Sequence, residues 1–219
     1  PPRSTPKPSS AASDVYKRQD WYDTDAKVNL RVIPMSGWQR DMKWNDTQLK
    51  WVPPSPNLPT FEHAYAYIGT CLFEGTTLSE GRGTEHPFLM MGGETSKIND
   101  DISLWSNHGV RLQPTQFTPV SIPGKALRPK GEGLLLNGIL WENALEHADP
   151  LTIGLRMMQW LMENSPEAAY KDYLYLLAGT DKIDQLSRNP INLKSDSLDI
   201  DWGSNFELFI EKRSNYLLY

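Results

Sequence analysis

Cysteine is almost absent from this sequence of 219 residues. Its single cysteine, Cys71, has no second thiol in the chain to pair with. A disulfide framework and a cysteine-based zinc site each need several thiols, so the sequence excludes both. The fold must instead be stabilised by burying apolar side chains, which a chain of this length can do without covalent staples.

The sequence also lacks a long apolar run and an excess of basic charge. No stretch approaches the roughly 20 apolar residues that a membrane-spanning helix needs. The 22 Lys and Arg residues are outnumbered by 27 Asp and Glu, which gives a net charge of −5. An acidic chain without a basic cluster argues against a nucleic-acid-binding protein.

Residues 1–19 differ in composition from the rest of the chain. Four of the 17 prolines fall within the first eight residues, and four Lys or Arg stand against one Asp. There is no apolar core typical of a secretory signal peptide. We expect this segment to be a non-native or disordered tail, with a native linker as the alternative. A non-native tail would imply that the natural protein was longer at its N-terminus.

Strand and helix patterns alternate over residues 20–219, which predicts an α/β or α+β fold. Strands are predicted at 27–35 and 133–141, with a strand pair around Pro114 in 110–120. Helices are predicted where caps precede periodic apolar residues, at 60–68, 98–107, 150–165, 180–186 and 204–217. The last of these has a capping box, Ser204 with Glu207, and an apolar face that includes Phe206, Phe209 and Ile210.

Residues 69–88, GTCLFEGTTLSEGRGTEHPF, combine glycines with charge. Gly75, Gly81 and Gly83 permit a positive φ and close approach of a ligand to the main chain. Arg82 lies between two of these glycines, so a tight turn could present its guanidinium, whose planar donors suit a carboxylate. Glu74 and Glu80 flank this arginine. They could hold it in place, or act as acid and base around a glycosidic bond.

Other interpretations of this segment and its neighbours remain open. One alternative is an internal pair of Arg82 with Glu80 or Glu74 that only fixes its own loop. A phosphate-binding loop is disfavoured, because the glycine spacing matches neither phosphate motif and the carboxylates would repel a phosphate. The four histidines lack the spacing of a helical zinc site, so no metal is expected. Ser79 is not in a nucleophile elbow.

The segments WVPPSPNLPT and GTCLFEGTTLSEGRGT-x-x-PF closely resemble the NamZ-type exo-β-N-acetylmuramidases, a bacterial family long known as a domain of unknown function. The resemblance extends to VIPMSGW, GVRLQPTQFTP, LLAGT and a C-terminal F-x-x-x-R-x-x-YLLY, and so covers essentially residues 20–219. One segment departs from the family pattern. From Lys125, which follows GVRLQPTQFTP after five intervening residues, the sequence reads KALRPKGEGLLLNGILWENALEH, without the expected cysteine and aspartate.

The resemblance implies an α/β protein of two domains with a cleft between them. Residues 20–92 would be the C-terminal part of a Rossmann-like catalytic domain, and residues 93–219 a smaller α+β auxiliary domain. The family releases N-acetylmuramic acid from the non-reducing ends of peptidoglycan fragments. Its proposed catalytic Glu lies in an N-terminal part that this sequence does not contain, so we expect the fragment alone to be inactive.

The resemblance and the residues together predict a site. Arg82 would grip the lactyl carboxylate of muramic acid, with Thr84 and Ser79 as further substrate-binding residues, while Glu80 and Glu74 would be catalytic. Glycoside hydrolysis by carboxylates needs no cofactor. The expected partners are muramic acid saccharides, and the expected location is the periplasm or the cell exterior. The alternatives are a non-catalytic cell-wall glycan-binding module and, less favoured, a nucleotide binder.

Overall fold

The computed structural model describes residues 33, 35–39, 41–181, 183, 192–194, 198, 200 and 204–214. The chain divides into two compact units, one of residues 1–48 with 201–219 and one of residues 49–200. The predicted tail at 1–19 lies outside the described residues, as does most of the predicted strand at 27–35. The predicted helix at 180–186 is described only at residues 180, 181 and 183.

Two elements are described in the first unit. The 3-10 helix η1 (Trp44–Thr47) begins after Lys43, whose backbone N–H donates to the Asp46 carboxylate at 2.7 Å. The helix α6 (Ser204–Ser214) confirms the last predicted helix. The prediction that its apolar face is buried is wrong, because Phe206, Phe209 and Ile210 are all exposed.

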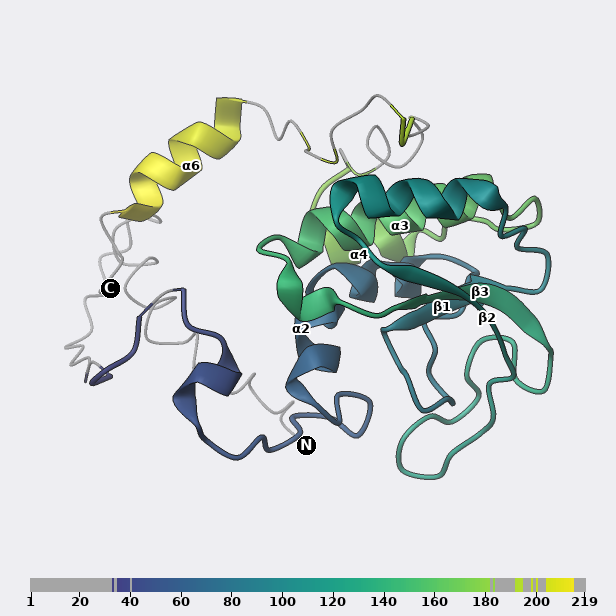
Figure 1. The fold of residues 1–219 in the computed structure, drawn as a ribbon, viewed down its shortest axis with the longest axis horizontal. Coiled ribbons are helices and arrows are strands. Elements are labelled where there is room, and N and C mark those ends of the chain that lie inside the picture. Colours follow the sequence, from purple (N-terminus) through teal and green to yellow (C-terminus); the bar gives the residue numbers. More distant parts are fainter. Residues whose placement is uncertain are drawn as a thin grey trace. The chain divides into compact units, whose positions relative to one another are not determined.

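Three strands form an antiparallel sheet in the described part of the second unit: β1 (Met90–Gly93), β2 (Leu112–Phe117) and β3 (Leu136–Trp141), in the order β1-β3-β2 (Figure 1). The predicted buried strand is confirmed as β3, the central strand, with Ile139 fully buried opposite Met91. The predicted strand pair around Pro114 is wrong, since β2 is one continuous strand. Proline lacks an N–H to donate, and a strand at a sheet edge tolerates that loss.

The helices α2 (Phe61–Thr70) and α3 (Pro150–Glu163) begin at the predicted caps. The Thr60 hydroxyl accepts from the N–H of His63, and the Asp149 carboxylate accepts from the N–H of Thr152 at 3.0 Å. The two helices contact through Gly69 and Gly154. A Cβ at Gly154 would lie only 2.6 Å from the carbonyl carbon of Gly69, so the helices approach to a distance that only glycine permits.

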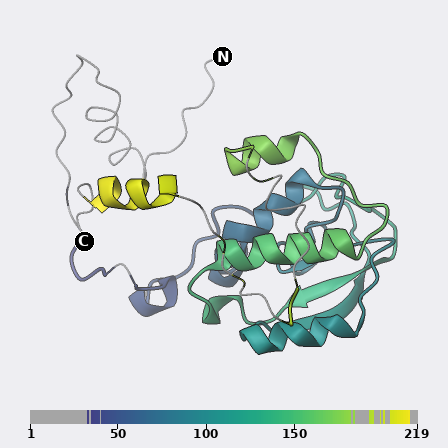
Figure 2. The same ribbon diagram turned by 90° about the horizontal axis from the view of Figure 1, so that it is seen from above.

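Four shorter elements also lie in the described part of this unit: η2 (Cys71–Gly75), η3 (Asp100–His108), η4 (Ala144–Glu146) and α4 (Tyr173–Ala178). The helix predicted at 98–107 forms as η3, with the tighter 3-10 turn, and ends at Gly109 with φ +73°. On η3 the buried Trp105 packs edge-on against Trp160 of α3, with ring centroids 6.3 Å apart. In the view of Figure 2, α3 runs between η3 and α4.

The prediction of a mixed helix and strand fold is confirmed. The described part of the predicted domain 20–92 contains η1, α2, η2 and the first three residues of β1, and β1 pairs with β3 from the predicted domain 93–219. The Rossmann-like arrangement and the boundary at residue 92 stay predictions. Within the described ranges, no helix has the length and apolar character to cross a membrane.

Candidate functional site

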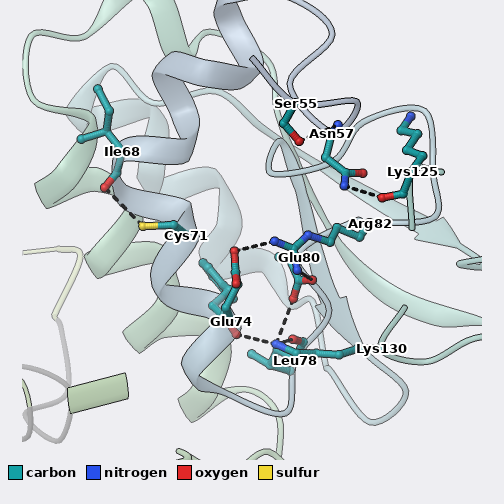
Figure 3. Close-up of polar contacts among 11 residues, drawn as sticks. Ser55, Asn57, Ile68, Cys71, Glu74, Leu78, Glu80, Arg82, Lys125 and Lys130 are labelled. Atoms are coloured by element: carbon teal, nitrogen blue, oxygen red, sulfur yellow. Dashed lines mark hydrogen bonds and ion pairs between the residues drawn. The ribbon is translucent and has the colours of Figure 1, made fainter. Parts of the chain in front are cut away.

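Four charged side chains meet beside η2 (Figure 3). Nη2 of Arg82 donates to Oε1 of Glu74 at 2.7 Å, and Nη1 of Arg82 lies 3.7 Å from Oε1 of Glu80. On the other side of Glu80, Nζ of Lys130 lies 2.9 Å from Oε2. Glu74 belongs to η2, Glu80 and Arg82 follow it, and Lys130 lies in the connection between β2 and β3. We call these four residues the charged cluster.

A glycine turn presents Arg82 to the cluster. Gly81 and Gly83 have φ of +76° and +82°, as their placement on either side of Arg82 predicts. A Cβ at Gly81 would lie 2.5 Å from the carbonyl oxygen of Met90, so this position also needs glycine for close packing. Gly75 serves differently, because its φ is not positive but a Cβ there would lie 2.6 Å from Cα of Leu174.

Glu80 is the buried anchor of the charged cluster. Its side chain is 3% exposed and lies between the two cations. Besides its ion pair with Glu80, Lys130 donates to the carbonyl oxygens of Phe73 at 2.7 Å and Leu78 at 2.9 Å. Burial lowers the pKa of Lys130, while the charge and hydrogen bond of Glu80 act in the opposite direction. Lys130 thus compensates the buried carboxylate and fixes the chain from Phe73 to Glu80.

Glu74 is the carboxyl group better suited to proton transfer. Burial raises the pKa of Glu74 above its ordinary value, Arg82 opposes that shift, and the negative charge of Glu80 adds to it. A raised carboxyl pKa is the direction of shift that a general acid requires. The structure brings both predicted catalytic residues together around Arg82, and it distinguishes them by burial.

Arg82 is paired within its loop but keeps unused donors. A guanidinium has five N–H groups, and in the described part of the chain the hydrogen bond of Arg82 goes to Glu74. Its Nε is buried and has no hydrogen-bond partner among the described residues, whereas its side chain as a whole is 34% exposed. The internal pairing considered for this arginine is therefore present. Contact of the remaining donors with a ligand stays a prediction.

The two other predicted substrate-binding residues maintain the turn. The Thr84 hydroxyl donates to the carbonyl oxygen of Gly81 at 2.6 Å and accepts from the N–H of His86 at 3.1 Å. The Ser79 hydroxyl accepts from the N–H of Gly81 at 3.2 Å, and Ser79 is 2% exposed. Their roles toward substrate stay predictions.

Two histidines lie near the same turn. The rings of His63 on α2 and His86 are stacked with centroids 6.4 Å apart, and Nδ1 of His63 lies 2.7 Å from the Thr60 hydroxyl. Burial lowers the pKa of His63, and the charge of His86 lowers it further. No group of three or more His, Cys, Asp or Glu side chains in the described residues could hold a metal ion.

Sequence reasoning missed two residues of this site. Lys130 lies 50 positions from Glu80, inside the segment that departs from the family pattern, and no motif marks it. The only signal that could have indicated Lys130 is a physical one: a buried carboxylate such as Glu80 needs a second cation to compensate its charge. Phe88 ends the glycine segment, and its ring lies under the Arg82 guanidinium with Cζ 5.1 Å from the ring centroid. Its proximity to Arg82 in sequence was the corresponding clue.

Comparison with known proteins identifies the family. Two family models match the chain: that for the N-terminal part of exo-β-N-acetylmuramidase NamZ at residues 11–62, and that for its C-terminal part at residues 65–219. The chain belongs to the NamZ family. This confirms the family that the glycine segment predicts. The two NamZ models meet at residues 63–64, within α2.

A curated relative and two solved structures resemble this NamZ-family chain. The peptidoglycan β-N-acetylmuramidase NamZ of Bacillus subtilis is 29% identical over 203 residues, which are 88% of this chain and 46% of that protein. Two crystal structures of DUF1343 family proteins from Bacteroides fragilis also match. One is 29% identical with a TM-score of 0.52, covering 76% of this chain and 43% of its own. The other is 20% identical with a TM-score of 0.68, covering 95% and 55%, and supports the fold alone.

The chain therefore spans about half the length of the relatives that it matches.

Proposed function

We propose that this chain forms the muramic-acid-recognising part of a glycosidase that releases N-acetylmuramic acid from the non-reducing ends of peptidoglycan fragments. The observation that carries the proposal is the pairing of Arg82, whose side chain is 34% exposed, with Glu74, a carboxyl whose pKa is raised. Muramic acid differs from glucosamine by a lactyl ether that bears a carboxylate. A half-exposed guanidinium is the side chain best suited to distinguish the two sugars.

The residues of the charged cluster take separate roles in this proposal. Arg82 binds the lactyl carboxylate through donors that Glu74 does not use. Protonated Glu74 gives its proton to the glycosidic oxygen as the bond to the anomeric carbon breaks, and water adds to that carbon. A second carboxylate must accept the proton of that water. Glu80, compensated by Lys130, keeps Arg82 in place.

We propose that the second carboxylate is a further catalytic Glu outside this sequence, as the family resemblance implies. We therefore assign substrate recognition and proton donation by Glu74 to this chain. We expect residues 1–219 alone to bind the substrate without hydrolysing it. Because the proposed substrate is peptidoglycan, we propose the periplasm or the cell exterior as the location of the protein. The proposed chemistry uses carboxylates and water, without a cofactor.

A pair of disaccharides tests this function. One carries N-acetylmuramic acid at its non-reducing end and N-acetylglucosamine at its reducing end, and the other has the reverse order. Calorimetric titration of residues 1–219 should show tighter binding of the first disaccharide, and chromatography should show no released N-acetylmuramic acid. Equal affinity for both would contradict the proposed end specificity. Product release by residues 1–219 would contradict the need for a further Glu.

A further inference from the structure

Phe88 has a backbone conformation that is unusual for its side chain. Its φ is +66°, in the left-handed region that bulky residues rarely adopt. Two other non-glycine residues in the described chain, Gln48 and Arg128, share this feature, but both are exposed whereas Phe88 is 1% exposed. A buried aromatic residue held in a strained conformation calls for an explanation, and such strain tends to collect at functional sites.

Hydrogen bonds on both sides hold this conformation. The N–H of Phe88 donates to the carbonyl oxygen of Glu80 at 2.7 Å. The Thr70 hydroxyl lies 2.9 Å from the carbonyl oxygen of Phe88 and 3.0 Å from that of Ala66, so it shares its proton between them. The backbone of Phe88 is thus tied directly to Glu80, which itself belongs to the charged cluster.

The ring of Phe88 lies between two polar side chains of the site. On one side, Cζ of Arg82 lies 5.1 Å from the ring centroid, within the range of a cation–π contact. On another, the ring of Tyr67 meets it edge-on, with centroids 4.7 Å apart and an interplanar angle of 86°. The negative ring face attracts the guanidinium. Glycine would adopt this φ without strain, as Gly81 and Gly83 do nearby, but it would offer no such face.

We propose that Phe88 is a positioning residue whose strained backbone places its ring under Arg82 and fixes the guanidinium between Glu74 and Glu80. The role in ligand binding rests on the proposed function, but the positioning itself does not. The competing explanation is that the Phe88 ring only fills space in the core, and the two explanations differ in what they predict for other side chains. An aliphatic side chain of similar size would fill the same space without holding a cation.

The test compares Phe88→Leu and Phe88→Met with Phe88→Tyr, which keeps the ring. NMR titration of the Glu74 carboxyl carbon reports on Arg82, because a displaced guanidinium no longer lowers the pKa of Glu74. We expect this pKa to rise in the Leu and Met variants and to stay at the wild-type value in the Tyr variant. Phe117→Leu, which truncates a buried aromatic side chain of β2, is the matched control and should leave the titration unchanged.

Affinity for N-acetylmuramic acid supplies the second readout. The Leu and Met variants should raise its Kd about two- to thirtyfold, the range of a cation–π contact, and the Tyr variant should restore it. Leu and Met variants that fold and titrate like wild type would overturn the proposal. Failure of the wild-type chain to bind N-acetylmuramic acid would instead count against the proposed function, since the Glu74 titration needs no ligand.

A measurement on the unaltered chain covers the case in which the variants do not fold. Protons above an aromatic face are shifted upfield by the ring current. The Arg82 side-chain protons of the wild-type chain should therefore resonate upfield of those of free arginine. They should also show nuclear Overhauser contacts to the Phe88 ring protons. Arg82 protons at free-arginine positions, without contacts to that ring, would overturn the proposal.

Discussion

Glu74 and Arg82 are joined by a 2.7 Å hydrogen bond, from Nη2 of the guanidinium to Oε1 of the carboxylate. Glu74 therefore lies directly beside the guanidinium that we propose binds the carboxylate of a ligand. With all four groups of the charged cluster ionised, its two carboxylates and two cations balance. Protonation of Glu74 leaves one positive charge in excess, so binding of an anion and protonation of Glu74 should favour each other.

Affinity for N-acetylmuramic acid should therefore depend on pH through Glu74. Because the pKa of Glu74 lies above its ordinary value of 4.5, affinity should increase as the pH falls from 7 to 5, where the ligand carboxylate is still ionised. Glu74→Gln keeps an acceptor for Arg82 but removes the charge. This variant should bind N-acetylmuramic acid about fivefold more tightly at pH 7, because about 1 kcal/mol of repulsion between the Glu74 and ligand carboxylates is removed. Its affinity should no longer depend on pH in this range. Calorimetry at pH 5 and 7 checks this, and weaker binding by the variant would contradict it.

Lys130 should be essential for stability because Glu80 is buried. Lys130→Met leaves that carboxylate without its closest cation, and breaking a buried ion pair costs about 3–5 kcal/mol of unfolding free energy. The double variant Lys130→Met/Glu80→Gln removes the orphaned charge and should recover much of the loss in urea denaturation. Arg111→Met breaks an exposed pair with Glu146 and should change stability far less. Losses that simply add in the double variant would contradict the coupling.

Gly154 should be required at the contact of α2 with α3. Alanine favours an isolated helix over glycine by about 1 kcal/mol, so propensity alone predicts a more stable Gly154→Ala variant. The new Cβ would instead lie 2.6 Å from the backbone of Gly69 and force the helices apart. We expect a net loss of about 1–3 kcal/mol, the usual cost of overpacking. An unchanged or higher midpoint in urea would contradict the close packing.

His63 should make the fold sensitive to acid. Its pKa is lowered in the folded chain, so between that value and its ordinary value of 6.5 the unfolded chain binds more protons than the folded one. Stability from this group is therefore present above pH 6.5 and is lost as the pH falls through the lowered pKa. His63→Gln should reduce the slope of unfolding free energy between pH 7.5 and 5. An equal slope in both proteins would assign the acid sensitivity to other groups.

Local signals account for the features that the sequence predicted well. The caps of α2 and α3 lie within three residues of the N–H groups that they accept from, so Thr60 and Asp149 could be identified without knowing the fold. The turn at Gly81 and Gly83 is equally local. Glu74, Glu80 and Arg82 lie within nine positions of one another, so a compact segment was enough to predict that they meet.

Features that depend on distant contacts could not be predicted in this way. Lys130 reaches Glu80 across 50 positions, and only the folded chain brings them together. The sequence predicts two strands divided at Pro114, because proline breaks the hydrogen-bonding ladder of a central strand. Its place at the edge of the sheet, which removes that objection, is set by the pairing of β2 with β3. The strain at Phe88 likewise arises from its ties to Glu80 and Thr70.

The central claim is that Arg82 recognises the carboxylate that distinguishes muramic acid from glucosamine. Its most direct test is titration of residues 1–219, wild type and Arg82→Ala, with N-acetylmuramic acid and N-acetylglucosamine. The wild type should prefer N-acetylmuramic acid, and Arg82→Ala should lose about 2 kcal/mol of that preference, the lower end for a charged hydrogen-bonded pair because the side chain is partly exposed. A preference that survives the loss of Arg82, or a wild-type chain that binds both sugars equally, would contradict the claim.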